Sequence, residues 1–259
     1  MQDKGLVSII MPTWACAKYI ADSIRSVQEQ TYHNWELLIQ DDSSTDGTDK
    51  VVMPFLKLDK RIKYECNLKN SGAAVTRNNA LRRAKGKWIA FLDADDLWLP
   101  EKLERQLNFM VENGYKFSYT NYQEINENSL NTGVLVRGPR HITKLGMFAF
   151  CWPGCLTVMY DRESLGIIQT ADIKKNNDYA MWLVLCRKSD CYQLNDVLAK
   201  YRRGRVGSIS THGYITMIRW HFCLWHEAEG KNVVISLFWT CINVFCGIFK
   251  KVVYVNQIK

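Results

Sequence analysis

The sequence lacks the cysteine and histidine spacings that are typical of zinc-binding and disulfide-rich proteins. Its nine cysteines are an odd number without a CxxC pair, and the nearest two, Cys151 and Cys155, are four residues apart. The segment HEAEG, which begins at His226, lacks the second histidine of a zinc-protease helix. These absences argue against a zinc site and against a disulfide framework.

Targeting, linker and repeat signals are absent as well. The polar start MQDKG is not a secretory signal, so we expect a protein of the reducing cytosol. No stretch rich in Pro, Gly or Ser divides the chain, and no repeat is evident. The 259 residues, of which 47% are hydrophobic, therefore predict one domain with a real core and a C-terminal appendage.

Positive charge is concentrated in the last quarter of the chain. The formal net charge is +8, and the segment from Asp196 onward contains nine Lys and Arg residues against three Asp and Glu, which leaves about +2 for the rest. This distribution predicts an anionic partner at the C-terminal end and argues against a nucleic-acid-binding protein.

Short apolar runs alternate with amphipathic segments over the first 116 residues. The runs LVSIIMPTW (6–14), WELLIQDDS (35–43), RIKYEC (61–66) and WIAFLDAD (88–95) are predicted strands. The segments 17–30, 71–86 and 99–114 are predicted helices. Because the strands are apolar almost throughout, we expect a mostly parallel sheet with helices on both faces. Further strands are predicted at 116–122, 133–137 and 155–162, and a helix at 176–188.

Polar residues follow three of these strands. Ligands bind beyond the C-terminal ends of the strands in an open parallel sheet. That rule places the segments 12–14, 41–44 and 93–96 on one rim. There, Asp42 could accept a hydrogen bond from a base imide N–H and Trp14 could stack on a base, although a loop aspartate and an interior tryptophan are also ordinary features of a fold.

Three carboxylates, Asp93, Asp95 and Asp96, follow the apolar run 88–92. Like charges repel one another at the end of a buried strand, so a positive ligand is expected there. A hard divalent cation such as Mg²⁺ or Mn²⁺ commonly takes one or two carboxylates together with substrate phosphates. The alternative for Asp95 or Asp96 is to cap the helix predicted near Leu99.

Three stretches, in this order, resemble the nucleotide-sugar-binding half of family 2 glycosyltransferases of the GT-A fold. They are VSIIMPTW, ELLIQDDSSTDGT and SGAAVTRNNALRRAKGKWIAFLDADDLWLPEKL, and the match runs from about Leu6 to Leu103. Within the family, the chain is similar to bacterial enzymes that build O-antigen, capsule or teichuronic acid. The resemblance implies a Rossmann-like α/β sheet in a catalytic domain over 1–212, with a nucleotide-sugar half (1–103) and an acceptor half (104–212), followed by a helical membrane-associating segment (213–259).

The resemblance also assigns residues to the nucleotide sugar. They are Pro12, Trp14, Asp42, Arg77, Asp93 and Asp95. Pro12 and Trp14 would flank a uracil and Asp42 would hydrogen-bond it. Arg77 would approach the nucleotide, and its alternative is a surface or ion-paired arginine.

A Mn²⁺ or Mg²⁺ ion is the implied cofactor. The resemblance assigns it to Asp95 and Asp96, with Asp96 favoured as the direct ligand, while Asp93 and Asp95 would support the ribose and the metal.

The acceptor side of the family carries a general base, usually the Asp of a Glu-Asp pair at the start of a helix. The run NNDYAMWLVL places Asp178 in that position, with Asn177 where the family has Glu. Asp178 would remove the proton of an attacking hydroxyl in a single inverting displacement. Its alternative role is a helix N-cap. A retaining or nucleotidyl-transferring enzyme is the rival chemistry, and the chain lacks its GxGxR-type start.

A basic segment, LAKYRRGRVGSIST (198–211), follows the helix of Asp178. Its residues Arg202, Arg203, Gly204, Arg205, Gly207 and Ser208 are predicted to form a flexible loop that closes over the diphosphate. The alternative is a solvated run of charge.

Seventeen uncharged residues, 233–249, lie between Lys231 and Lys250. About twenty apolar residues span a bilayer, so this segment is a marginal span. Its small or polar members, Ser236, Thr240, Asn243 and Gly247, fall on one helical face. We expect that face to pack on the body or on a partner while the apolar remainder lies in the membrane interface. The alternatives are a core helix and a homo-oligomer contact.

These features together predict a non-processive enzyme. The run TMIRW (216–220) is similar to the QxxRW signature of processive members but lacks its Gln. The expected activity is transfer of a hexose, glucose or galactose, from a UDP-sugar to an undecaprenyl-diphosphate-linked sugar. The expected place is the cytoplasmic face of the bacterial inner membrane. The alternative is a catalytically silent adaptor that binds nucleotide sugars at the membrane.

Overall fold

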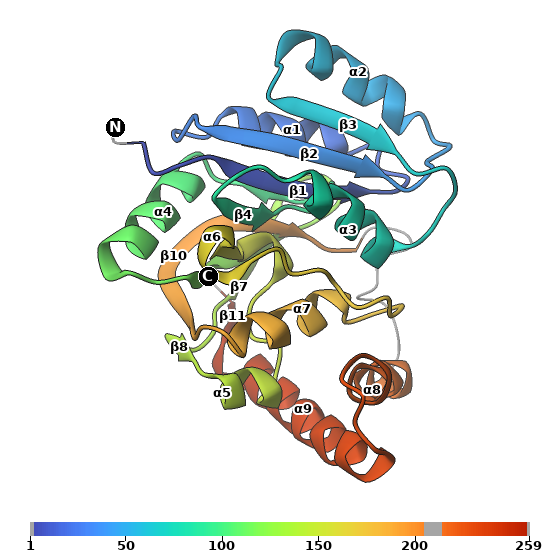
Figure 1. The fold of residues 1–259 in the computed structure, drawn as a ribbon, viewed down its shortest axis with the longest axis vertical. Helices are drawn as coiled ribbons and strands as arrows, with labels where there is room; N and C mark the ends of the chain where they lie inside the picture. Colours follow the sequence, from blue (N-terminus) through green and yellow to red (C-terminus); the bar gives the residue numbers. More distant parts are fainter. Residues whose placement is uncertain (1–2, 205–213, 258–259) are drawn as a thin grey trace.

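The first half of the chain forms a parallel sheet, as its alternating pattern predicts. The computed structural model, which describes residues 3–204 and 214–257, contains here the strands β1 (Val7–Thr13), β2 (Trp35–Asp41), β3 (Ile62–Cys66) and β4 (Trp88–Phe91). Strand β1 lies between β2 and β4 and is parallel to both, and β3 is parallel to β2. Their C-terminal ends therefore meet at one edge, where the arrowheads of β1 to β3 point the same way (Figure 1).

The second half adds antiparallel neighbours, so the complete sheet is mixed. Its strands are β5 (Leu97–Trp98), β6 (Phe117–Ile125), β7 (Asn131–Val136), β8 (His141–Ile142), β9 (Met159–Asp161), β10 (Cys191–Arg202) and β11 (Val255–Gln257). The order is β11-β7-β6-β9-β4-β1-β2-β3, and β10 pairs with β5, β6 and β8. Strand β9 is antiparallel to both β4 and β6, which joins the two halves into one sheet.

Helices cover both faces of this sheet. They are α1 (Ile20–Gln28), α2 (Thr48–Leu58), α3 (Ala73–Arg83), α4 (Lys102–Asn113), α5 (Lys144–Ala149), α6 (Arg162–Leu165), α7 (Asn177–Cys186), α8 (Tyr214–Cys223) and α9 (Val233–Val253), with a 3₁₀ turn η1 (Cys155–Thr157) and a π-helical turn η3 (Leu224–Ala228). Figure 1 shows α8 and α9 at the opposite end of the molecule from α2 and β3.

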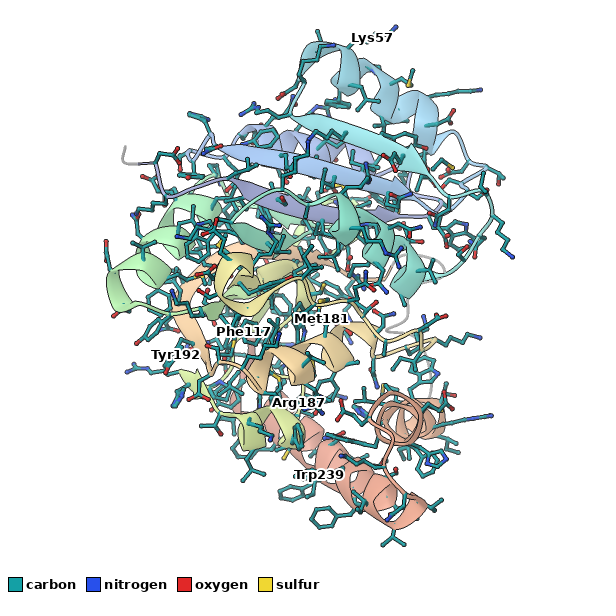
Figure 2. All side chains as sticks on the ribbon, in the orientation of Figure 1. Lys57, Phe117, Met181, Arg187, Tyr192 and Trp239 are labelled. Atoms are coloured by element: carbon teal, nitrogen blue, oxygen red, sulfur yellow. The ribbon has the colours of Figure 1, made fainter. Side chains whose placement is uncertain are left out.

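Two apolar clusters lie on the two faces, because successive residues of a strand point to opposite sides. Val7 and Ile9 of β1 pack with α1 and α4, whereas Ile10 packs with α3 and α7. Phe117 of β6 and Met181 of α7 belong to the second cluster (Figure 2). The continuous apolar runs of the sequence are therefore strands that are buried on both faces.

Several segments differ from the sequence prediction, among them α2, the segment 155–162 and strand β10. Helix α2 is not predicted, because Pro54 in its interior lacks an N–H group and normally interrupts a helix. The strand predicted over 155–162 is shorter: Cys155–Thr157 is a 3₁₀ turn, and only Met159–Asp161 pairs in the sheet.

Helix α9 turns its small and polar stripe toward the body, as predicted. Ser236, Thr240 and Asn243 are buried, and a side chain at Gly247 would meet the ring of Phe150 at 3.0 Å. Among residues 3–204 and 214–257, α9 is the one helix long and apolar enough to cross a membrane. Its outer face is exposed, since the described part of the chain buries only a small part of its apolar stretch.

Candidate active site

Asp42 lies directly after β2 and organises the loop that leads into α3. Its Oδ1 accepts hydrogen bonds from Asn67 Nδ2 (2.8 Å) and from the backbone N–H of Ser71 (2.7 Å), and its Oδ2 accepts from the N–H of Gly72 (2.8 Å). A carboxylate offers about four acceptor positions. Three are used, so Oδ2 can accept one further donor, as the predicted contact to a base imide requires.

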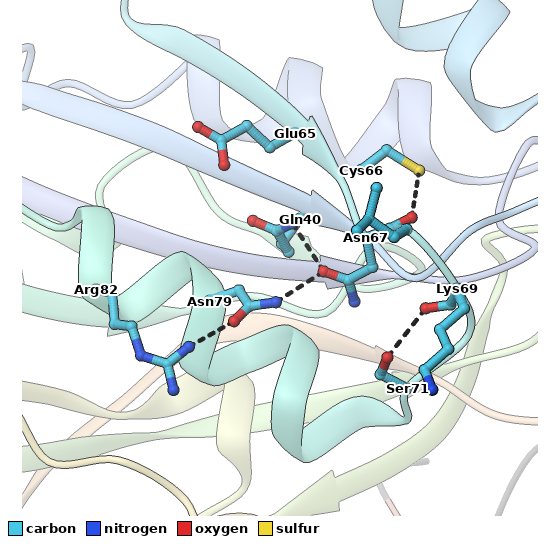
Figure 3. Close-up of a pocket in the computed structure, with 9 residues that line it drawn as sticks. Gln40, Glu65, Cys66, Asn67, Lys69, Ser71, Asn79 and Arg82 are labelled. Carbon is cyan, nitrogen blue, oxygen red and sulfur yellow. Dashed lines mark hydrogen bonds between the residues drawn. The ribbon is translucent and has the colours of Figure 1, made fainter.

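Asn67 is a residue of this rim that the sequence analysis missed. It borders a pocket of about 480 Å³ at the ends of β2 and β3 (Figure 3). The Oδ1 of Asn67 accepts hydrogen bonds from Gln40 Nε2 (3.0 Å) and Asn79 Nδ2 (2.8 Å), while its Nδ2 donates to Asp42 Oδ1. The rule of strand ends would have found it, because Asn67 directly follows β3.

The tips of β1 and β2 hold each other in a strained conformation. Ala15 and Ser43 both have positive φ angles, +50° and +62°, and the N–H of Ala15 donates to Ser44 Oγ at 2.9 Å. Such angles disfavour residues with a Cβ and occur often at functional sites. The turn leaves Trp14 55% exposed next to the half-buried Pro12. The indole is therefore accessible to a flat ligand at this rim.

Arg77 joins the two halves of the site. Its Nη2 donates to Asp93 Oδ1 (3.1 Å) after β4, and its Nη1 donates to Asn177 Oδ1 (2.7 Å) at the start of α7. Burial opposes its positive charge, but Cys155, Asp93 and Asp178 together raise the pKa of the guanidinium above its ordinary value. Of the two alternatives for Arg77, a surface arginine is wrong because the side chain is buried, whereas an ion-paired arginine is confirmed by the contact with Asp93.

The carboxylate turn does not cap the following helix. Helix α4 begins at Lys102, and its N-cap residue is Glu101, so the capping role considered for Asp95 and Asp96 is wrong. Asp96 is buried, and its Oδ1 accepts the backbone N–H of Arg202 at 2.8 Å. Burial, and then the charge of Asp95 and Asp93, raise the pKa of Asp96 well above its ordinary value.

The donor set of this turn fits a hard divalent cation. Asp93 and Asp95 are half-buried at the rim and present carboxylate oxygen, which Mg²⁺ and Mn²⁺ prefer. Across residues 3–204 and 214–257, no three His, Cys, Asp or Glu side chains converge to hold a metal on their own. This agrees with a site in which one or two carboxylates act together with substrate phosphates.

Arg202 corrects the prediction of a flexible loop over 198–211. The segment 198–202 is the end of β10, and Arg202 is only 2% exposed. Its Nε donates to the carbonyl of Asp95 (2.8 Å), and its Nη1 donates to the carbonyls of Asn126 (3.0 Å) and Glu127 (3.1 Å). Arg202 thus ties the carboxylate turn to the β6–β7 turn, and it takes no part in a mobile loop.

The rest of the predicted basic loop divides in two. The exposed side chain of Arg203 forms an ion pair with the buried Glu124 (3.0 Å), and Gly204 has a φ of +85°. Arg205, Gly207 and Ser208 lie outside the described residues.

Asp178 lies in the first turn of α7, near Arg77 and Asp93. The N-cap residue of the helix is Asn176, so the capping alternative for Asp178 is wrong. Its Oδ1 accepts the N–H of Tyr179 at 2.8 Å. Burial raises the pKa of Asp178, while Arg77 acts in the opposite direction. A half-buried carboxylate with a raised pKa and a nearby cation has the character of a general base.

The chain is similar to known proteins over most of its length. The sequence model described as "Glycosyl transferase family 2" matches residues 8–162. TuaG of Bacillus subtilis, named for teichuronic acid biosynthesis, is 42% identical over 77% of this chain and 79% of its own length. WfgD of Escherichia coli is 42% identical over 82% of both chains, and its name describes a UDP-Glc:α-D-GlcNAc-diphosphoundecaprenol β-1,3-glucosyltransferase.

Solved structures share the fold. The Staphylococcus aureus protein TarS, in complex with UDP-GlcNAc, superposes with a TM-score of 0.68 at 20% identity, over 89% of this chain and 69% of that one. The Pyrobaculum calidifontis mannosyltransferase PcManGT, in complex with GDP-Man and Mn²⁺, superposes with a TM-score of 0.63 at 17% identity, over 94% and 75% of the two chains. These likenesses confirm the predicted GT-A architecture.

Proposed function

The chain belongs to glycosyl transferase family 2, and we propose that it transfers a hexose, glucose or galactose, from a UDP-sugar to a lipid-linked sugar diphosphate in the assembly of a bacterial surface polysaccharide. The observation that carries the proposal is the Arg77 bridge, which brings the carboxylate turn after β4 and the start of α7 into one site. The activity named for WfgD supports the choice of UDP-sugar and lipid-linked acceptor.

The donor nucleotide lies across the ends of β1, β2 and β4 in this proposal. Trp14 and Pro12 flank the uracil, and the remaining acceptor position on Asp42 Oδ2 takes its imide N–H. Asp93 supports the ribose, and Arg77 holds Asp93 in place. The strained tips of β1 and β2 fix these groups before the ligand binds.

A Mn²⁺ or Mg²⁺ ion, when bound, supplies positive charge that balances the diphosphate leaving group. Asp95 and Asp96 are the residues we assign to it. Asp95 is half-buried at the rim, and Oδ1 of the buried Asp96, which the resemblance favours as the direct ligand, accepts the N–H of Arg202. The manganese named with PcManGT is in keeping with this assignment.

Asp178 is the proposed general base of a single inverting displacement. It takes the proton of the acceptor hydroxyl, whose oxygen forms a bond to the anomeric carbon as the bond from that carbon to the diphosphate breaks and UDP leaves. Burial keeps the pKa of Asp178 above its ordinary value, which makes the ionised carboxylate a stronger base.

The outer face of α9 is proposed to rest on the cytoplasmic surface of the inner membrane, where a lipid-linked acceptor is found. Its apolar side chains are exposed, and the exposed Lys251 lies in its last turn, whereas the neighbouring Lys250 donates to the carbonyls of Cys151 (3.4 Å) and Trp152 (2.7 Å) in the body. Such a helix binds an interface through its apolar face and through its cations.

The test is release of UDP from a panel of UDP-sugars, with Mn²⁺, Mg²⁺ or EDTA, in the presence of a GlcNAc-diphosphate-lipid acceptor. We expect turnover with one donor, lost in EDTA, and a roughly 10²–10⁴-fold lower rate for Asp178→Asn with UDP binding retained. Asp172→Asn, an exposed carboxylate six residues away, is the control. UDP binding without turnover under any of these conditions would point to the silent adaptor.

A further inference from the structure

A second pocket, of about 750 Å³, lies between the segment that precedes α7 and the helical segment formed by α8 and η3. Its volume is in the range of small-molecule sites. We call it the acceptor pocket, and its main lining residues are Ile173, Lys174, Lys175, Ile215, Arg219 and Trp220. None of them belongs to the donor rim.

The acceptor pocket has an excess of positive charge. Lys174, Lys175 and Arg219 line it, and Glu227 is the only acid among its lining residues. In the part of the chain that the structure describes, none of the three cations forms an ion pair with a carboxylate. A concave surface with several uncompensated cations concentrates anions.

Aromatic and aliphatic side chains complete the pocket. Lys175 Nζ lies 5.6 Å from the centre of the Trp220 ring, and Ile173 is buried beside it. Burial, and then the charge of Lys174, lower the pKa of Lys175, as expected for cations gathered without a counter-charge. The surroundings therefore favour a ligand with an anionic part and an apolar part.

The acceptor pocket adjoins the proposed base. Lys175 is three residues before Asp178, so their Cα atoms are at most about 10 Å apart along the chain. One sugar ring can bridge such a separation. On its other side α8 packs against α9, whose outer face is apolar and exposed.

We propose that the acceptor pocket binds the diphosphate of the lipid-linked acceptor, a proposal that rests on the function given above. Lys174, Lys175 and Arg219 take the phosphate oxygens, with Arg219 suited to two parallel hydrogen bonds. The acceptor sugar then extends toward Asp178, and the lipid leaves along Ile215 toward α9. Recognition of the diphosphate, and not of the sugar alone, sets the specificity for the acceptor.

The variant Lys174→Gln/Arg219→Gln removes two exposed cations from the pocket. Two acceptors are compared: GlcNAc joined through a diphosphate to an alkyl chain, and GlcNAc joined directly to the same chain. We expect KM for the first to rise at least about tenfold, while KM for the second and for the donor are unchanged. Lys57→Gln on α2, at the opposite end of the molecule (Figure 2), is the control variant.

Different results are expected if these cations bind a ligand other than the acceptor diphosphate. A rise in donor KM would assign them to the donor diphosphate and overturn the proposal. Equal effects on the two acceptors would overturn it as well. Weaker binding to phosphatidylglycerol vesicles with an unchanged acceptor KM would assign them to membrane lipid instead.

Calorimetry separates this proposal from the proposed function. Binding of the diphosphate acceptor is measured with saturating UDP, so no turnover is needed. Binding that the double variant loses, in a protein that transfers no sugar, would support the pocket and overturn the enzymatic role. If the protein does transfer sugar but wild type and variant bind the acceptor equally, the enzymatic role is supported and the proposed pocket is overturned.

Discussion

Arg202 and Arg203 are neighbours on the chain, yet their surroundings differ completely. Arg202 is buried and donates to three carbonyls and to Ser129 Oγ, whereas the side chain of Arg203 is exposed and makes one ion pair, with the buried Glu124. The hydrogen bonds of a buried charge contribute more than those of an exposed charge, because water does not readily replace them when they are lost. In this basic run, Arg202 is therefore a buried structural residue, whereas Arg203 carries a charge at the surface.

Replacing Arg202 by Gln should lower the free energy of unfolding by about 3 kcal/mol, because the carbonyls of Asp95, Asn126 and Glu127 lose the donor that a buried guanidinium supplies. Arg25→Gln, which removes an exposed ion pair with Asp22, is the control and should change it by at most about 1 kcal/mol. Urea unfolding of the two variants measures the difference. Equal midpoints for both would show that Arg202 does not hold the turn.

Asp178 should reduce stability at neutral pH, since burial raises its pKa above the ordinary value of 3.8. Between the two values the folded state binds more protons than the unfolded state, so stability falls as pH rises through this window. Asp178→Asn should therefore be more stable than wild type at pH 7, and the advantage should shrink toward pH 4. Thermal unfolding across this range measures it, with Asp172→Asn as control. A variant less stable than wild type at pH 7 would contradict the argument.

At the scale of elements, one side chain anchors α9 to the body. Asn243 Nδ2 donates to the carbonyls of Phe148 (2.9 Å) and Ala149 (2.8 Å), and its Oδ1 accepts from Trp225 Nε1 (2.8 Å). Asn243 is fully buried, so each bond forms away from water. The helix is therefore fixed in rotation, and its apolar side is held outward.

Asn243→Leu should lower the free energy of unfolding by about 2–4 kcal/mol, because it removes the acceptor of a buried indole N–H and the donor to two carbonyls. Cys241→Ser on the exposed side of the same helix should change it by less than about 0.5 kcal/mol. Urea unfolding gives these values, and hydrogen exchange of α9 amides should be faster in the first variant alone. Unchanged exchange would mean that α9 is held by other contacts.

The sequence predicts elements well where a single apolar pattern decides them. The strands β1 to β4 and the helix of Asp178 are confirmed, because continuous apolar runs indicate strands that are covered on both faces. Helix α2 is missed because Pro54 masks it. Strand β10 is missed because it depends on pairing with β6, which is far away in the sequence, and because its last residues, 198–202, begin a basic segment that is typical of a loop.

The same distinction, between features set by local sequence and features set by distant residues, applies to the candidate site. The rim residues at the C-terminal ends of β1, β2 and β4 are predictable, since the C-terminal ends of parallel strands meet at one edge. The burial of Asp96 and the pairing of Arg77 with Asn177 are not, because both depend on residues that are distant in the sequence.

At the scale of the whole molecule, the outer face of α9 should bind anionic membranes. Replacing Phe238, Phe245 and Ile248 by Ser removes three exposed apolar side chains from this face. Burial of each such side chain contributes about 1.5–3 kcal/mol of favourable free energy, so the affinity for vesicles should fall more than about tenfold. Binding of the wild type should weaken with salt, because the lysines contribute. Sedimentation with phosphatidylglycerol vesicles measures both effects.

A matched triple variant controls for general loss of surface hydrophobicity. Leu58, Leu68 and Leu130 are equally or more exposed but lie away from α9, and their change to Ser should leave vesicle binding unaltered. Similar losses in both variants would exclude α9 as the specific contact.

The bridge from Arg77 to Asn177 also bears on how new enzymes of this kind can be assembled by recombination. A crossover near residue 103 would take Arg77 from one parent and the start of α7 from another. Where the second parent carries a glutamate at the Asn177 position, the buried guanidinium would meet a full negative charge in place of an amide. Chimeras that exchange acceptor halves should therefore carry both positions from the same parent.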